Sequence, residues 1–451
     1  MTKIRNILPL FIFGTFFLTG LFSCGEDRWP EYYPETGRDL WIDSVMRQEY
    51  LWYEYMPSIA PGQYFLEPDA FLEKVRSPQD KGFSTIDTLD NEPVPTYGFD
   101  YMLYKVLDND TAYNALITYV IPESPAAGAG LKRGDWIMMV DDDYITRRNE
   151  EVLNEGGART LTIGRYAVVE GEDGEDMGVI QSMGNVTVAG ARTVTDNPVH
   201  KTEVFRITGT DRIVGYLMYN HFTAGPAAGS EAYNDELRAF SQQCKQSGVN
   251  EFVLDLRYNT GGAMECAQLL CTMLAPETQM NNALAILRYN DKQVGKNKEL
   301  ALDPAVLQGG ANLNLSRIYI LATGETAAAA EMVINCLKPY MEVVLIGATT
   351  KGENVATETF TTTQFRWVLR LVVCEVFNSQ GESNYANGFA PNYAVNETAE
   401  LQWFLPFGKP DEALLNVALN LIAGHTPETR MVRRTARPME MVKKSNEING
   451  L

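Results

Sequence analysis

Two glycines follow a strongly apolar segment, in a pattern suited to holding a negatively charged oxygen. Residues 252–256 read Phe-Val-Leu-Asp-Leu and predict a buried strand, and the chain then passes through Arg-Tyr-Asn-Thr to Gly261 and Gly262 before a predicted helix. Glycine lets backbone N–H groups approach a substrate oxygen closely, as an oxyanion hole requires. For this segment alone, an ordinary strand–turn–helix connection is the alternative.

Two later segments contain further candidates for chemistry. Residues 318–331 read Ile-Tyr-Ile-Leu-Ala-Thr-Gly-Glu-Thr-Ala-Ala-Ala-Ala-Glu, and residues 345–355 read Leu-Ile-Gly-Ala-Thr-Thr-Lys-Gly-Glu-Asn-Val. With the glycine turn, which looks like "DLRxNxGG", they resemble the carboxy-terminal-processing (tail-specific) serine peptidases. That resemblance implies a serine nucleophile within "TASASE" and a lysine general base within "GxTTxGKNV". A weak hydroxyl needs such a base to attack an amide.

The family pattern falls on this sequence without gaps, but its catalytic side chains are missing. Ala328 stands at the nucleophile position, and Glu353 stands 25 positions later at the general-base position, which is the family's own spacing. The resemblance also places Gly261 and Gly262 at the oxyanion-hole turn. Thr357 stands where some relatives have a helper glutamine. Loss of a serine nucleophile costs roughly 10⁶ in turnover, so we expect no detectable cleavage.

Three functions remain open from these residues. The favoured one is an inactive homologue that binds extended peptides or protein C-termini without cutting them. The second is a serine peptidase with a displaced catalytic set, for which Lys351, a threonine at 323 or 326, or His221 paired with Glu331 are the candidates; we interpret Thr326 instead as a helix N-cap. The third is a regulatory scaffold for an active relative.

A peptide-binding module is predicted before the catalytic-type segments. Residues 124–137 read Ser-Pro-Ala-Ala-Gly-Ala-Gly-Leu-Lys-Arg-Gly-Asp-Trp-Ile, which resembles a PDZ domain. The resemblance implies that Tyr97, Gly98, Phe99 and Asp100 bind a peptide carboxylate. PDZ domains hold extended peptides by adding them to the edge of a sheet.

The expected fold class is multidomain α/β (α+β), with a helical N-terminal domain, a PDZ-like β domain and a peptidase-like (ClpP/crotonase-like) α/β core. The expected boundaries are 1–24 for a lipoprotein signal peptide, 25–38 for a tether, 39–94, 95–203 and 204–425 for the three domains, and 426–451 for a loosely held extension. Alternating patterns predict core strands at 213–219, 252–256, 318–322, 343–346 and 367–373, and helices at 232–247, 263–273 and 326–336.

The N-terminus predicts export and a lipid anchor. Lys3 and Arg5 precede an apolar run over residues 7–22 that is short for a membrane span, which is typical of a secretory signal. The run ends in Leu-Phe-Ser-Cys-Gly, which resembles a bacterial lipobox and implies a lipidated Cys24. Simple cleavage beside a spare cysteine is the alternative. The expected location is the bacterial cell envelope, in the periplasm or on the outer membrane.

The composition disfavours nucleic acid as a partner and gives no indication of a cofactor. The net charge of −20 disfavours nucleic acid, which needs a basic surface. Beyond Cys24 the chain has five cysteines, an odd number within apolar runs, so buried free thiols are expected rather than a disulfide framework. With three histidines and no CxxC pair, no metal or organic cofactor is implied.

Overall fold

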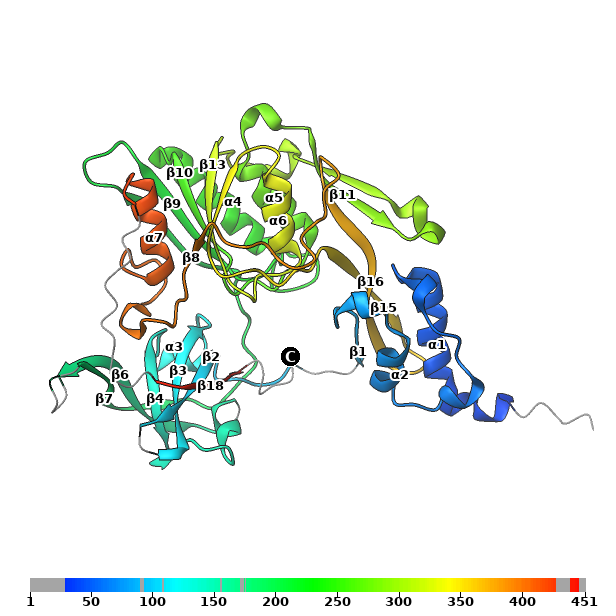
Figure 1. Ribbon diagram of the computed structural model, residues 1–451, viewed down its shortest axis with the longest axis horizontal. Helices are drawn as coiled ribbons and strands as arrows, with labels where there is room; N and C mark the ends of the chain where they lie inside the picture. Colours follow the sequence, from blue (N-terminus) through cyan, green and yellow to red (C-terminus); the bar gives the residue numbers. More distant parts are fainter. Residues whose placement is uncertain are drawn as a thin grey trace, which may run out of the picture.

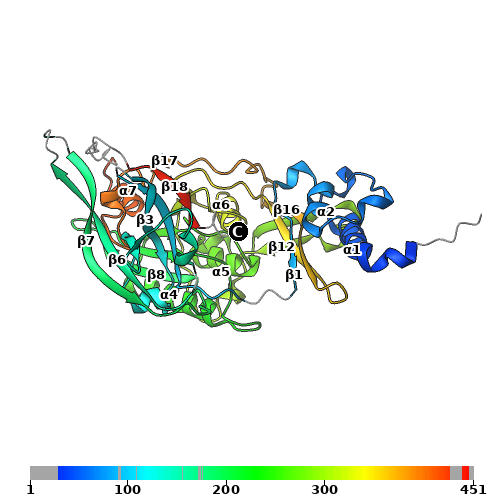
Figure 2. The same ribbon diagram turned by 90° about the horizontal axis from the view of Figure 1, so that it is seen from below.

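The computed structural model describes residues 29–89, 93–107, 109–154, 156–170, 174, 176–426 and 439–445. The chain forms an α/β core, a β domain and a helical N-terminal region that packs on a second sheet (Figure 1). The β domain and the N-terminal helices lie at opposite ends of the molecule (Figure 2). The predicted multidomain α+β class is confirmed.

The core is built on a six-stranded sheet in the order β17-β14-β13-β10-β9-β8. All neighbours pair in parallel except β8, which is antiparallel to β9. The strands are β8 (Val199–Arg206), β9 (Ile213–Tyr219), β10 (Glu251–Asp255), β13 (Arg317–Ala322), β14 (Glu342–Gly347) and β17 (Tyr393–Ala394). Every residue of β10 is buried, as expected for a central parallel strand covered on both faces.

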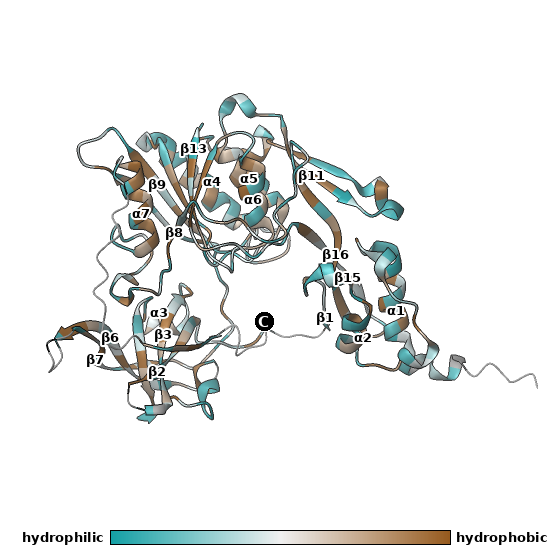
Figure 3. Ribbon diagram, in the orientation of Figure 1, coloured by the Kyte–Doolittle hydropathy of each residue, from teal (hydrophilic) through white to brown (hydrophobic). Residues whose placement is uncertain are grey.

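Helices cover both faces of this sheet. Leu217 and Leu254 face a hydrophobic cluster with α4 (Ala232–Ser247), α5 (Met264–Leu274) and α6 (Ala329–Leu337). The alternate residues Tyr216 and Val253 face a second cluster with α7 (Ala413–Ile422). Apolar residues colour these strands and helices brown in Figure 3. Alternation across the strands therefore builds a three-layer core.

A second sheet links the core to the N-terminal region. Its order is β1-β16-β11-β12, and β15 also pairs with β16. The strands are β1 (Thr85–Thr88), β11 (Ala283–Tyr289), β12 (Lys298–Ala301), β15 (Val355–Thr362) and β16 (Trp367–Asn378). The strand predicted at 367–373 is therefore longer, and it belongs to this sheet rather than to the core sheet.

The N-terminal helices are α1 (Tyr33–Glu49) and α2 (Pro68–Val75). The described part of the predicted tether is helical, because a short 3-10 helix at Trp29–Tyr32 leads directly into α1. Pro34 lies in the first turn of α1, where the missing N–H costs nothing. The Tyr33 ring packs edge-on against Phe365 with centroids 5.9 Å apart. These contacts order residues that we expected to form a tether.

The β domain contains a seven-stranded sheet in the order β18-β2-β3-β4-β6-β7, with β5 paired to β4. Its elements are β2 (Phe99–Val106), β3 (Asn109–Val120), α3 (Pro125–Gly128), β4 (Asp135–Val140), β5 (Asp143–Tyr144), β6 (Arg159–Glu170), β7 (Asp176–Val188) and β18 (Met441–Lys444). Because β8 begins at Val199 within the core sheet, the boundary expected at residue 203 lies a few residues too late.

The end of the chain differs from the expected loose extension. Residues 441–444 form β18, which pairs antiparallel with β2. None of the helices within the described ranges combines the length and the apolar composition that a membrane span requires. Cys24 lies outside the described residues.

Candidate active-site cavity

The residue at the predicted nucleophile position lies on a strained turn just before α6, which we call the elbow. Ala328 has φ 47° and ψ −114°, immediately before α6 begins at Ala329. A non-glycine residue in such a sparsely populated region costs on the order of 1–3 kcal/mol, and such strain gathers at functional sites. A sharp strand-to-helix turn of this kind presents a nucleophile in hydrolase folds. Here it presents a methyl group.

The glycine turn lies directly against this elbow. A Cβ added at Gly261 would lie 2.7 Å from the Cβ of Ala328, so only glycine fits there. The backbone N–H of Ala327 donates to the carbonyl of Asn259 at 3.0 Å, which joins the two segments. The structure therefore brings together the predicted nucleophile position and the predicted oxyanion turn.

The two glycines differ in how their N–H groups are used. The N–H of Gly261 donates to Oδ1 of Asn259 at 2.9 Å. Among the hydrogen bonds of the described residues, none is donated by the N–H of Gly262 or of Ala329. Gly262 is exposed, and a Cβ there would lie 2.3 Å from the Phe222 carbonyl. If this turn serves as an oxyanion hole, as predicted, these two free N–H groups are its donors.

A buried carboxylate ties the elbow to the loop that carries Glu353. Glu331 on α6 accepts the backbone N–H groups of Gly352 at 2.8 Å and Glu353 at 2.7 Å, and it also accepts a hydrogen bond from the Thr350 hydroxyl at 2.5 Å. Burial raises the pKa of Glu331, and these hydrogen bonds oppose the rise. The N–H of Lys351 also donates to the Thr326 carbonyl at 3.0 Å. The sequence indicates Glu331 as a motif residue and as a possible partner of His221, but it does not predict this positioning role.

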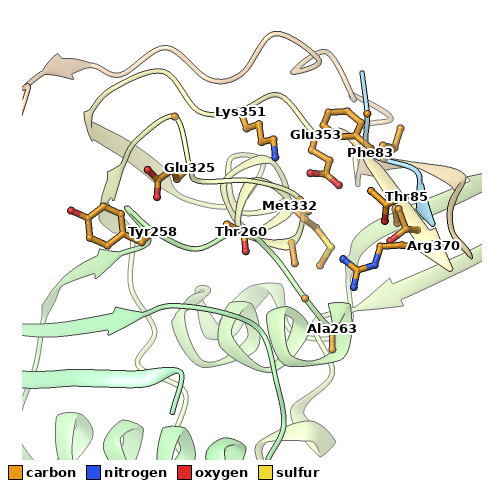
Figure 4. Close-up of a pocket in the computed structure, with 18 of the residues that line it drawn as sticks. Phe83, Thr85, Tyr258, Thr260, Ala263, Glu325, Met332, Lys351, Glu353 and Arg370 are labelled. Atoms are coloured by element: carbon orange, nitrogen blue, oxygen red, sulfur yellow. The ribbon is translucent and has the colours of Figure 1, made fainter. Parts of the chain in front are cut away.

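Glu353 and Ala328 line one cavity of about 1040 Å³. The carboxylate of Glu353 points into it near Phe83, with Lys351 and Arg370 on nearby walls (Figure 4). Burial raises the pKa of Glu353 to about 7; the Lys351 charge opposes the rise and Glu331 adds to it. The side chain at the predicted base position is therefore an acid that is partly protonated near neutral pH.

All three regions of the chain contribute to the walls of this cavity. The N-terminal region supplies Phe83 and Thr85, the β domain supplies Asp100 to Met102, and the core supplies Tyr258 and the elbow. The exposed hydroxyl of Thr260, next to the glycine turn, also faces it (Figure 4). We did not single out Thr260 from the sequence, where nothing distinguishes it from other turn residues.

The two threonine candidates are hydrogen-bonded away from the cavity, whereas the Lys351 candidate lines it. The Thr326 hydroxyl is buried and donates to the Leu256 carbonyl at 2.8 Å, and the Thr323 hydroxyl donates to the Arg257 carbonyl. Thr326 is not the helix N-cap that we predicted, because Ala328 holds that position and Thr326 accepts the N–H of Thr323 instead. Neither hydroxyl is placed to act as a nucleophile.

The histidine candidate lies apart from Glu331. Nδ1 of His221 is 2.9 Å from the Thr223 hydroxyl, and its Nε2 is 3.7 Å from Asp196. Burial lowers the pKa of His221. No contact joins His221 to Glu331 in the described residues, so these two side chains do not form a catalytic pair.

A buried ionic network joins the β domain to the glycine turn. Arg133 of the β domain donates to Glu397 at 2.7 Å and to the Tyr258 hydroxyl at 2.8 Å. Arg257, fully buried, pairs with Glu397 at 2.9 Å and with Glu412 at 2.6 Å. Burial opposes ionisation of Glu397, but the two guanidinium groups lower its pKa to about 2. This network fixes the segment that leads to Gly261.

The predicted peptide-binding loop lies at the start of β2. Tyr97 and Phe99 are buried, and the Tyr97 hydroxyl donates to the Gly157 carbonyl at 2.6 Å. A Cβ at Gly98, which has φ 82°, would lie 2.2 Å from the Ser124 Cβ. Asp100 is exposed and lines the cavity. Of the four predicted residues, Asp100 alone offers its side chain to the cavity, so any carboxylate binding by the others uses backbone groups.

No group of three or more His, Cys, Asp or Glu side chains within the described residues could hold a metal ion. The five cysteines after Cys24 are free and buried, as expected: Cys244, Cys266, Cys271, Cys336 and Cys374.

Comparisons with known proteins identify the class that this fold and cavity define. Peptidase family S41 matches residues 213–395, and the Peptidase S41 N-terminal domain matches residues 39–85. A solved Bacteroides fragilis structure assigned to the S41 proteases is 56% identical, with a TM-score of 0.82, over 85% of this chain and 97% of that one. The chain belongs to the S41 peptidase family, as the motifs predicted.

Curated relatives are more distant. The carboxy-terminal-processing protease of Bartonella bacilliformis is 25% identical over 64% of this chain and 60% of its own length. The carboxyl-terminal-processing protease of a Picosynechococcus species is 25% identical over 53% of this chain and 51% of its own length. The chain therefore matches about half to three-fifths of these relatives.

Proposed function

We propose that this chain is a catalytically inactive member of the S41 family that binds extended peptides or protein C-termini without cutting them. The observation that carries the proposal is Ala328 on the strained elbow, against Gly261 and the free N–H of Gly262. A site with this backbone can hold a peptide carbonyl. It has no hydroxyl at the elbow with which to attack that carbonyl, and Glu353 replaces the amine base.

The names of the relatives support the choice of ligand. The Bartonella bacilliformis relative is a carboxy-terminal-processing protease, whose name states that it acts at carboxyl termini. The β domain adds support, because the predicted carboxylate-binding loop opens the strand β2 beside the cavity. We infer that this domain is PDZ-like and that it delivers an extended peptide to the elbow.

The decisive test is a parallel measurement of cleavage and binding. Purified residues 25–451 are incubated with unfolded casein and with fluorescent peptides that have free C-termini, and a serine-directed fluorophosphonate probe reports any reactive hydroxyl. We expect peptide binding, no cleavage and no labelling. Binding without cleavage supports the proposal, whereas the absence of both, also when residues 441–445 on β2 are replaced, would favour a scaffold for an active relative.

Two variants test whether another hydroxyl in the cavity acts as the nucleophile. Thr260→Val removes the exposed cavity hydroxyl, and Thr193→Val removes an exposed hydroxyl outside the residues that line the cavity. Cleavage by the parent chain that is lost in Thr260→Val but kept in Thr193→Val would establish a displaced nucleophile. That result would overturn the inactive assignment.

We further propose that the chain is exported and held on a cell-envelope membrane by a lipid on Cys24. The supporting observation is the apolar run over residues 7–22, which ends two residues before this cysteine. The test is metabolic labelling of the full chain with a fatty-acid analogue, beside a Cys24→Ser variant. Equal labelling of both chains, or of neither, would refute the anchor.

A further inference from the structure

The strand β2 is covered by the chain's own C-terminal segment. Without β18, β2 would be the edge of the β-domain sheet. The pairing is antiparallel, with Lys443 opposite Leu103 and Lys444 opposite Met102. It continues beyond the strand at both ends, because the N–H of Lys105 donates to the Glu440 carbonyl at 3.0 Å. At the other end, the N–H of Tyr101 donates to the Ser445 hydroxyl at 3.2 Å.

The direction of β18 is that expected for a bound peptide. An extended peptide that binds by strand addition uses the free N–H and C=O groups of an edge strand. Since β18 is antiparallel to β2, its C-terminal end approaches the start of β2, where the loop of Tyr97 to Asp100 lies. The Ser445 hydroxyl is 3.4 Å from Oδ1 of Asp100. In Figure 1, β18 runs beside β2 toward the centre of the molecule.

The same segment reaches the active-site cavity. Lys444 and Ser445 line it together with Ala328 and Glu353. The ammonium of Lys444 lies 2.7 Å from Oε1 of Glu325, on the turn that precedes the elbow. A peptide that replaced β18 along β2 would enter the cavity at this point.

The acidic side chains around β18 indicate which peptides the β2 edge accepts. Lys443 pairs with Glu150 of the β domain at 3.1 Å, and Lys444 pairs with Glu325 of the core. The two lysines are consecutive, so their side chains reach acids on different sides of the strand. Since Asp100 also lines the cavity, an extended segment with two consecutive basic residues complements this edge. An acidic segment would meet like charges.

The contacts that hold β18 on β2 are weak enough for another peptide to displace it reversibly. The strand has four residues, and Met441 and Val442 remain 45% and 38% exposed, so few apolar contacts hold it. Its register shifts between Met441 and Lys443. The lysine–glutamate pairs are partly exposed, so solvent screens them and each contributes little to holding the strand. A peptide with better apolar contacts can therefore compete with it.

We propose that residues 439–445 are a ligand held in cis on the peptide-binding edge, and that this edge selects extended peptides with two consecutive basic residues. The proposal rests on the peptide-binding function proposed above. It adds the chemical class of the ligand, and it adds that binding requires release of the chain's own C-terminal segment.

The test measures occupancy and binding separately, on the chain of residues 25–451. In the first variant, Met441 to Ser445 are replaced by Gly-Ser-Gly-Ser-Gly. The second variant is Lys444→Glu. Its charge-matched control is Lys409→Glu, which changes an exposed loop lysine outside the strand. Hydrogen exchange of residues 101–105 reports whether the edge is covered. The probe is a fluorescent Met-Glu-Met-Val-Lys-Lys-Ser peptide, and the specificity control is the same peptide with Glu-Glu in place of Lys-Lys.

We expect faster exchange over residues 101–105 and at least about tenfold tighter probe binding when the segment is replaced, with a smaller gain for Lys444→Glu and none for Lys409→Glu. The Glu-Glu peptide should bind at least about tenfold more weakly than the probe. Unchanged exchange, with equal probe binding by parent and variant, would overturn the cis ligand and leave the proposed function standing. Equal binding of the two peptides would overturn the basic preference. Faster exchange with no peptide bound by any chain would overturn the proposed binding function, and the competing role of β18 with it.

Discussion

The carboxylate of Glu331 accepts the backbone N–H of Glu353 at 2.7 Å, so a buried acid on α6 fixes the residue that stands at the predicted base position. Glu331 is fully buried, and its hydrogen bonds span the loop of residues 350–353. The positions predicted for nucleophile and base are therefore held in one arrangement although neither carries the expected side chain. The hydrogen bonds of Glu331 reach the backbone of this loop, so they do not require the side chain of Glu353.

The first prediction concerns this framework. Glu331→Gln should lower the free energy of unfolding by about 2–4 kcal/mol, because the amide NH₂ group would face backbone donors and leave one of them buried without an acceptor. Urea unfolding measures the loss, and faster hydrogen exchange over residues 350–355 locates it. Glu342→Gln, which removes an exposed partner of Arg317, is the control and should cost under about 1 kcal/mol. Equal losses in both variants would contradict the positioning role.

The second prediction is that catalysis needs both missing side chains. Ala328→Ser alone should not restore cleavage, because a serine hydroxyl without a base attacks amides poorly. Ala328→Ser combined with Glu353→Lys should exceed the single variant by about 10²–10⁴-fold, the usual contribution of a general base. The readout is cleavage of a fluorogenic peptide. The control is Ala328→Ser with Glu265→Lys, which puts a lysine at an exposed position on the same cavity. Robust cleavage by Ala328→Ser alone would contradict the requirement for both side chains.

The third prediction follows from the raised pKa of Glu353. A carboxyl whose pKa rises from 4.5 to about 7 on folding binds more protons in the folded state than in the unfolded state between these values. The contribution of Glu353 to the stability of the parent chain should therefore fall by about 1–3 kcal/mol as pH rises from about 4.5 to 7, and then level off. Glu353→Gln should remove this contribution from the pH dependence of the parent chain and be the more stable chain at pH 8. Glu265→Gln is the control, and the same pH dependence in the parent chain and in Glu353→Gln would exclude the contribution of Glu353.

Local sequence patterns predicted the core well, because its elements are strongly periodic. The predicted strand at 213–219 and helix at 232–247 have the bounds of β9 and α4. The helix predicted from Thr326 begins three residues later, at Ala329. An alanine run favours helix throughout, but the hydrogen bond from Ala327 to Asn259 and the left-handed φ of Ala328 delay its start. The tertiary contacts that shape the elbow have no local signal.

The elements that the sequence did not predict depend on distant partners. The strand β18 is four residues with two lysines, and it is ordered by β2, more than three hundred residues earlier in the chain. Residues 29–38 have the proline and glycine that are typical of a tether, yet the Tyr33 ring packs against Phe365 and orders them. The motif match predicted that Ala328 and Glu353 would share a site, and they line one cavity. It could not show that Glu331, Arg133 and Glu397 hold that site together, because such roles depend on three-dimensional contacts.

The last prediction concerns the buried ionic network between Arg133, Arg257 and Glu397. A carboxylate whose pKa falls from 4.5 to about 2 on folding stabilises the folded state above pH 4.5, and this contribution is lost as pH falls toward 2. Glu397→Gln should therefore lose about 2–4 kcal/mol at pH 7, and the difference from the parent chain should narrow below pH 4. Urea unfolding at pH 7, 5, 4 and 3 follows the loss, beside the exposed control Glu299→Gln. If the network also couples the β domain to the glycine turn, Glu397→Gln should speed hydrogen exchange over residues 256–262. A pH-independent loss, with exchange unchanged at that turn, would mean that Glu397 contributes packing alone.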